Sequence, residues 1–85
     1  MKASVEISYY PLKEEYIAPI QGFIDRLHEY KAIRVRTNTM STQVFGEYFE
    51  MMEIITREIH TSFELPGSIF VMKIINADLD PDKQW

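Results

Sequence analysis

Hydroxyl and amide side chains are crowded into one short stretch of this chain, residues 35–46. Seven of its twelve side chains carry a hydroxyl, an amide or a guanidinium group. Such groups donate and accept hydrogen bonds, but a hydroxyl becomes a nucleophile only beside an activating base. The hydroxyls of Ser8, Thr37, Ser41 and Thr42 have no histidine or lysine partner visible in the sequence. The stretch therefore favours binding of a polar molecule over catalysis.

Other catalytic and metal-binding patterns are absent from the sequence. His28 and His60 are far apart and have no carboxylate at metal-ligand spacing, so both are expected at the surface. There is no nucleophile elbow, phosphate-binding loop or dinucleotide-binding motif. Cysteine is also absent, which excludes a thiol nucleophile and a disulfide framework and fits a cytoplasmic protein. We expect no catalytic residue, no metal and no cofactor.

Length and charge narrow the class of protein further. The 85 residues predict one small domain, residues 1–85, which leaves much of its surface in water unless it self-associates. The net charge of −4 argues against a nucleic-acid partner, because phosphate backbones require a basic surface. No apolar run approaches the ~18 residues of a membrane span, so no membrane partner is expected.

Hydrophobic periodicity predicts six elements around the polar stretch. Alternating residues predict strands, and apolar spacings of three and four predict helices. The expected elements are a strand over 3–10, a helix from about 18, strands over 33–38 and 41–47 with a turn at 38–40, a helix over 48–62 and a strand over 68–76. This order is that of an α+β, ferredoxin-like βαββαβ sandwich, with a four-stranded antiparallel sheet and two helices on one face.

The last strand and the tail carry separate expectations. Ser68 to Asn76 is apolar on both faces, so we expect it to be covered on both sides, in the interior of the sheet or against a partner subunit. The Asp-rich tail, residues 77–85, is expected to be mobile. Its single tryptophan, Trp85, is either a loose end or a contact with a partner.

The sheet face without helices is expected to mix polar and apolar side chains. Its predicted members from the first three strands are Glu6, Ser8, Tyr10, Arg34, Arg36, Gln43 and Phe45. A mixed face of this kind suits self-association to a homodimer or homotetramer through the sheet. The alternative is a solvated face with surface ion pairs of little energetic worth.

A resemblance to a known family is carried by two segments. Val5-Glu-Ile-Ser-Tyr-Tyr-Pro-Leu12, with the acidic pair and helix that follow, resembles the start of the YkoF-type family and its short single-domain relatives. Thr37-Asn-Thr-Met-Ser-Thr42 and the later Gly46 resemble the family's threonine, polar residue, Ser-Thr and Gly pattern. The resemblance covers roughly residues 5–59. It implies a ferredoxin-like domain that assembles through its sheet and binds thiamine or its hydroxymethylpyrimidine moiety without converting it.

The chemistry of individual residues agrees with such a ligand. An aminopyrimidine has ring nitrogens that accept and an amine that donates hydrogen bonds. Its edge could be satisfied by Ser8, Thr37, Asn38, Ser41 and Thr42; its faces could be covered by Tyr10, Met40 and Phe45; and a thiazolium could be neutralised by Glu6. Where some relatives have Asp, this chain has Asn38, which hydrogen-bonds but offers no full charge.

Packing alone is the alternative role for several of these residues. Met40 could pack onto its own hairpin, and the aromatic residues could belong to the core or to an interface. The alternative function is an oligomeric ferredoxin-like regulatory or small-enzyme domain that binds another small metabolite at a subunit interface.

Overall fold

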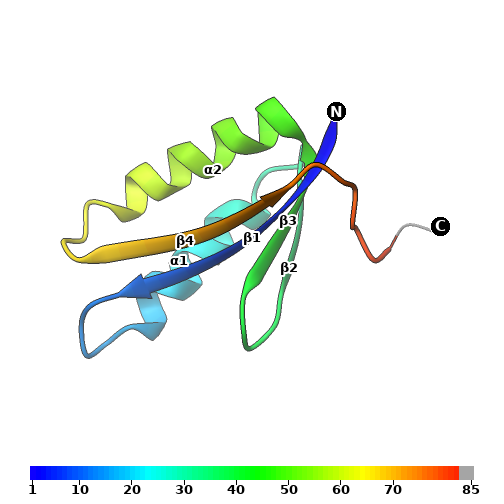
Figure 1. Ribbon diagram of the computed structural model, residues 1–85. Helices are drawn as coiled ribbons and strands as arrows, with labels where there is room; N and C mark the ends of the chain where they lie inside the picture. The colour runs from blue at the N-terminus through cyan, green and yellow to red at the C-terminus, as the bar shows by residue number, and fades with distance from the viewer. Residues whose placement is uncertain (83–85) are drawn as a thin grey trace.

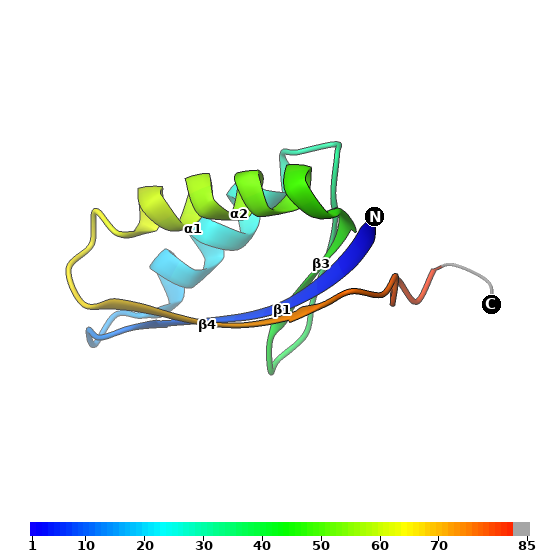
Figure 2. The same ribbon diagram turned by 45° about the horizontal axis from the view of Figure 1, so that its top comes forward.

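The computed structural model describes residues 1–82 and places both helices on one face of a four-stranded sheet (Figures 1 and 2). The elements are β1 Lys2–Pro11, α1 Ile17–His28, β2 Arg34–Thr37, β3 Thr42–Glu47, α2 Tyr48–Ser62 and β4 Ser68–Ile75. The strand order is β2-β3-β1-β4, and every pairing is antiparallel. The predicted ferredoxin-like βαββαβ fold is therefore confirmed.

The long strand β1 is the centre of the sheet. It pairs with β3 from Lys2 to Ile7 and with β4 from Ser4 to Pro11. Its odd-numbered side chains turn toward the helices, which follows from the two-residue period of a strand. The buried core that forms there comprises Ala3, Val5, Ile7, Tyr9, Phe23, Leu27, Ile33, Val44, Met51, Ile54 and Ile55.

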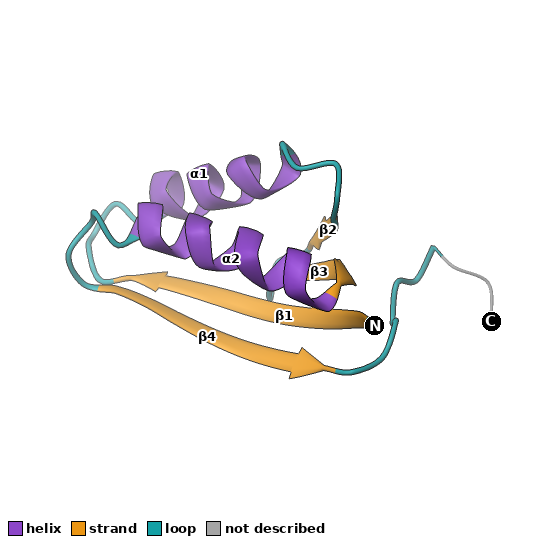
Figure 3. Ribbon diagram, turned by 90° about the horizontal axis from the view of Figure 1, so that it is seen from above, coloured by secondary structure: helices purple, strands orange, loops and turns teal. Residues whose placement is uncertain are grey.

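Local sequence signals explain where the helices begin. Pro19 lies in the first turn of α1, where its missing N–H costs no internal hydrogen bond. The Glu47 side chain caps α2 by accepting the N–H of Phe49 at 3.1 Å. Seen from above, α1 and α2 lie side by side over the sheet (Figure 3), and the Arg26 guanidinium joins them by donating to the Glu58 carboxylate at 2.7 Å.

The position of β4 corrects one prediction. We expected an interior strand or one covered by a partner, because its residues are apolar on both faces. The strand instead lies at the edge of the sheet, paired only with β1 among the strands of residues 1–82. Ile69 and Val71 on its open face are 44% and 59% exposed, and Met72 and Ile74 on its helix face are also exposed. Coverage of this strand by a partner subunit stays a prediction.

The C-terminal segment crosses the open face of the sheet after β4. The Ser4 hydroxyl on β1 donates to the carbonyl of Ala77 at 2.7 Å and accepts the N–H of Leu79 at 2.9 Å. Further along, the Asp80 carboxylate pairs with Arg34 of β2 at 2.9 Å, so the segment spans from one edge of the sheet to the other. The predicted mobility of this tail stays a prediction, and Trp85 lies outside the described residues.

Candidate functional site

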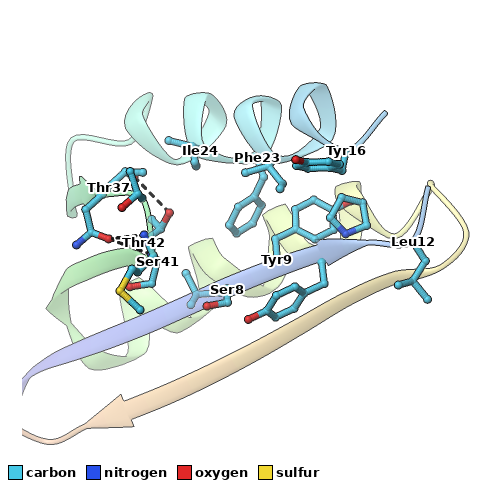
Figure 4. Close-up of a pocket in the computed structure, with 16 residues that line it drawn as sticks. Ser8, Tyr9, Leu12, Tyr16, Phe23, Ile24, Thr37, Ser41 and Thr42 are labelled. Atoms are coloured by element: carbon cyan, nitrogen blue, oxygen red, sulfur yellow. Dashed lines mark hydrogen bonds between the residues drawn. The ribbon is translucent and has the colours of Figure 1, made fainter. Parts of the chain in front are cut away.

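A cavity of about 450 Å³ lies where β1 extends beyond the β2–β3 hairpin. Three elements form its walls: the second half of β1 with the loop after it, the first half of α1, and the hairpin turn at residues 37–42. Figure 4 places Thr37, Ser41 and Thr42 on one side, Leu12 and Tyr16 on the other, and Phe23 and Ile24 above β1. Its volume falls within the range usual for small-molecule sites, about 300–1,000 Å³.

The structure brings seven of the nine predicted site residues to this cavity. They are Ser8, Tyr10, Thr37, Asn38, Met40, Ser41 and Thr42. Thr37 and Thr42 share a hydrogen bond of 3.2 Å between their hydroxyls, across the hairpin. The hydroxyl of Ser8 has no hydrogen-bond partner within residues 1–82, so it is available to a ligand. The polar side of the cavity is thus built by the stretch that the sequence singled out.

Asn38 has a structural task as well as a place in the lining. Its side-chain carbonyl accepts the N–H of Met40 at 2.8 Å and the N–H of Ser41 at 3.1 Å, which closes the turn. Met40 at the tip is 86% exposed, so it does not pack down onto its own hairpin. Only the amide nitrogen of Asn38 remains for a ligand, because the oxygen is already engaged.

Glu6 lies beside the cavity rather than in its lining. Its carboxylate accepts the Ser41 hydroxyl at 3.1 Å and pairs with the Lys73 ammonium of β4 at 3.5 Å. Phe45 lies farther away, opposite Ser4 in the pairing of β1 and β3. It lines a smaller hollow of about 270 Å³ on the open face, together with Glu6 and Leu79. The structure therefore does not bring Phe45 to the hairpin cavity.

The apolar side of the cavity was not identified as a site from the sequence. It comes from Leu12, Tyr16, Ile20, Phe23 and Ile24. The spacing of the α1 residues predicts an apolar stripe facing a core, and Phe23 and Ile24 are indeed buried. The first turn reaches beyond the hairpin, however, so Tyr16 and Ile20 line the cavity.

Aromatic packing fixes the floor of the cavity. The Tyr9 ring stacks on Phe70 with centroids 4.2 Å apart and meets the edge of Phe23 at 5.9 Å. Its hydroxyl shares a 2.8 Å hydrogen bond with Ser68. These contacts anchor the Tyr9 side chain in the core at the point where β1 borders the cavity.

The side chains that line this cavity are uncharged. Its residues include hydroxyls, an amide and aromatic rings, but none is a carboxylate, histidine or lysine. Within residues 1–82, no three acidic, histidine or cysteine side chains gather as a metal site would require.

No helix of this part of the chain is long and apolar enough to cross a membrane.

Comparisons with known proteins identify the fold. No protein-family model and no curated protein sequence matches the chain. A Streptococcus pneumoniae protein of known structure is 24% identical with a TM-score of 0.83, over 93% of this chain and 90% of that one. A Thermotoga maritima protein with a suggested role in thiamine biosynthesis or salvage is 18% identical, with a TM-score of 0.82 over 91% of this chain and 85% of that one. A domain of unknown function from Bacillus cereus is 14% identical, with a TM-score of 0.66 over 93% of this chain and 79% of that one. At these identities the likeness establishes a shared fold.

Proposed function

We propose that this protein binds thiamine or its hydroxymethylpyrimidine moiety in the hairpin cavity, without converting it. The observation that carries the proposal is the division of the cavity into a hydroxyl-rich wall from residues 37–42 and an apolar wall from α1. A substituted aminopyrimidine has the same division, with a polar edge and two apolar faces. A site of this kind orients its ligand through a few polar groups and holds it through apolar contact.

The lining also favours holding over reacting. General acid–base catalysis requires a titratable side chain within hydrogen-bond reach of the reacting group. The titratable side chains of the lining are tyrosines, and no carboxylate or imidazole is among its residues. A bound pyrimidine would therefore meet groups that fix its orientation.

Glu6 suggests how the cationic vitamin would lie. Its carboxylate accepts a hydrogen bond from the Ser41 hydroxyl, at one end of the polar wall. With the pyrimidine inside the cavity, a thiazolium directed toward Ser41 would approach this carboxylate and compete with Lys73 for it. Opposite charges at close range would then favour thiamine over the neutral pyrimidine alcohol.

Two further lines support this ligand class. The sequence resembles the thiamine-binding YkoF-type family over the first strand and the hairpin, the two segments that border the cavity. The Thermotoga maritima neighbour with a suggested role in thiamine biosynthesis or salvage has the same fold. Fold likeness alone has little functional weight, so the cavity chemistry carries the argument.

Calorimetric titration tests the proposal with thiamine and hydroxymethylpyrimidine as separate ligands. Ser8→Ala and Ser41→Ala each remove one hydroxyl from the polar wall and should weaken binding about 2- to 10-fold per lost hydrogen bond. Thr56→Ala on the exposed face of α2 is the matched control and should bind normally. Absence of binding by both ligands at millimolar concentration would contradict the proposal. Binding of an unrelated metabolite instead would favour the alternative of a regulatory or small-enzyme domain.

We further propose that subunits self-associate through the open face of the sheet, as a homodimer or homotetramer. Tyr10, Ile69 and Val71 are exposed there on neighbouring strands β1 and β4. These apolar side chains are gathered on one face of a small domain. Covering them with a second subunit removes apolar surface from water, which is favourable.

A further inference from the structure

The free edge of β1 borders the cavity. Pairing between β1 and β3 ends with Ile7 opposite Thr42, whereas β1 continues to Pro11 with only β4 beside it. Continuing the same register would place Met40 opposite Tyr9, but the chain has already turned away, and the Met40 N–H is donated to Asn38. A gap in the ladder is therefore left beside Tyr9, and Tyr9 lines the cavity.

The direction of the main-chain groups along β1 follows from two hydrogen bonds near its ends. The Leu12 N–H donates to the carbonyl of Gly67 just before β4, and the Met1 carbonyl accepts the N–H of Tyr48 just after β3. In an antiparallel sheet, successive residues direct their N–H and C=O groups to opposite edges. Even-numbered residues of β1 thus face β4, and odd-numbered residues face β3. The Tyr9 N–H and C=O consequently point into the gap.

These two groups of Tyr9 have no hydrogen-bond partner within the described part of the chain. They are also held in place, because the Tyr9 side chain is 8% exposed, stacked on Phe70 and hydrogen-bonded to Ser68. A main-chain donor and acceptor left unpaired beside an apolar wall cost free energy unless a partner satisfies them. A ligand can supply that partner without any reorganisation of the strand.

We propose that the Tyr9 main chain recognises the ligand through two hydrogen bonds. Its N–H donates to a ring nitrogen, and its C=O accepts a hydrogen bond from the adjacent exocyclic amine. This inference rests on the proposed function and deepens it. It assigns the ligand to planar heteroaromatic rings that present a neighbouring acceptor and amine donor, the edge of a 4-aminopyrimidine. The ring would take the place that a strand residue takes opposite Tyr9.

The surroundings of the gap agree with a flat ring. A ring paired to Tyr9 in this way lies near the plane of the sheet, so one face turns toward α1. Phe23 and Ile24 lie there, above β1 (Figure 4). The hydroxyls of Ser41 and Thr42 then lie at the hairpin side of the same gap.

The gap is too short for a peptide strand. Ile7 is already paired with Thr42, and the Pro11 carbonyl accepts the N–H of Lys13 at 3.0 Å. Proline also has no N–H to donate. Only one residue of the free edge therefore offers both groups, whereas strand addition requires a run of them.

Amide hydrogen exchange followed by NMR tests the assignment in the full chain. Without ligand, the Tyr9 amide should exchange at least about tenfold faster than the Ile7 amide, although both lie within β1. Saturating hydroxymethylpyrimidine should slow Tyr9 exchange by at least about tenfold more than it slows Ile7 exchange, since stabilisation of the whole fold slows both amides. Tyr9→Phe keeps the main chain and should retain this protection.

A ligand series provides the second measurement. The analogue of hydroxymethylpyrimidine without its amine leaves the Tyr9 carbonyl unpaired and should bind about tenfold more weakly. Plain 4-aminopyrimidine, cytosine and adenine carry the same edge on different rings and serve as further probes.

The outcomes separate this inference from the proposed function. Protection of Tyr9 by 4-aminopyrimidine, without binding of thiamine or hydroxymethylpyrimidine, would support the inference and contradict the proposed function. Binding of hydroxymethylpyrimidine with unchanged Tyr9 exchange, or no protection by any of the probes, would overturn the inference. A slow Tyr9 amide in the free protein would overturn it as well.

Discussion

The Asp80 carboxylate lies 2.9 Å from the Arg34 guanidinium and is only 2% exposed, which joins the C-terminal segment to the edge strand β2. Arg34 also pairs with Asp82, and Arg36 contacts Asp82 at 3.0 Å. The segment reaches these arginines from β4, at the opposite edge of the sheet. A charge cluster therefore connects the two edges across the open face.

We predict that Asp80→Ala destabilises the protein by about 1–3 kcal/mol, because the ion pair with Arg34 and the hydrogen bond from the Asp82 N–H are both lost at a buried position. Urea unfolding followed by circular dichroism measures the change. Glu64→Gln is the control, since Glu64 is exposed and makes no ion pair to residues 1–82. Equal unfolding curves for Asp80→Ala and the control would show that the contacts of the Asp80 carboxylate contribute nothing to stability.

A second prediction concerns Asn38, which the sequence suggested as a reader of the ligand. Because its oxygen accepts two main-chain N–H groups of the turn, Asn38→Ala should destabilise the protein by about 1 kcal/mol and weaken hydroxymethylpyrimidine binding. Asn38→Asp keeps an acceptor at the same position and should restore both properties. Calorimetric titration and thermal unfolding of the two variants measure the effects. If Asn38→Asp binds as weakly as Asn38→Ala, the amide nitrogen itself contacts the ligand.

The fold was largely predictable because its signals are local. Alternation along β1 and helical spacing from Tyr48 to Ser62 each report which side of one element is buried. The place of β4 depends instead on which strands pair, and no local pattern contains that information. An apolar strand looks the same at an edge as in the interior, which is why the interior interpretation of β4 was wrong.

The candidate site was predictable on one side only. Hydroxyl and amide residues at the hairpin are unusual enough to be recognised by type. The α1 wall has the same apolar spacing as a core stripe, so Tyr16 and Ile20 could not be distinguished from packing residues. The free N–H and C=O of Tyr9 belong to the main chain, which every residue type shares. They are exposed only because β3 ends opposite Ile7, and that depends on register.

A third prediction concerns alkaline pH. Tyr30 donates its hydroxyl to the Glu58 carboxylate at 2.5 Å, and this hydrogen bond raises the pKa of Tyr30 above its ordinary value, although Arg57 acts in the opposite direction. The folded protein therefore holds this proton more tightly than the unfolded chain does. The resulting stability is complete below about pH 10 and is lost as the pH rises through the folded-state pKa.

Tyr30→Phe has no hydroxyl to titrate, so it should lose less stability than the wild type as the pH rises above about 10. Urea unfolding at a series of pH values measures the difference in slope. Tyr16→Phe is the matched control, because the Tyr16 hydroxyl makes no hydrogen bond within the described residues. Parallel stability profiles for the wild type and Tyr30→Phe would contradict the prediction.

The fourth prediction tests self-association through the open face. Val71 is 59% exposed on the edge strand β4, so Val71→Lys should leave the fold intact and place a charge in the proposed interface. Burying an unpaired ammonium is unfavourable, and the variant should therefore dissociate to monomers. Phe49→Lys makes the same change on α2, on the helical side of the molecule, where Phe49 is 78% exposed. Light scattering coupled to size-exclusion chromatography should find the Phe49 variant assembled like the wild type. Dissociation by the Phe49 change but not the Val71 change would move the interface to the helices.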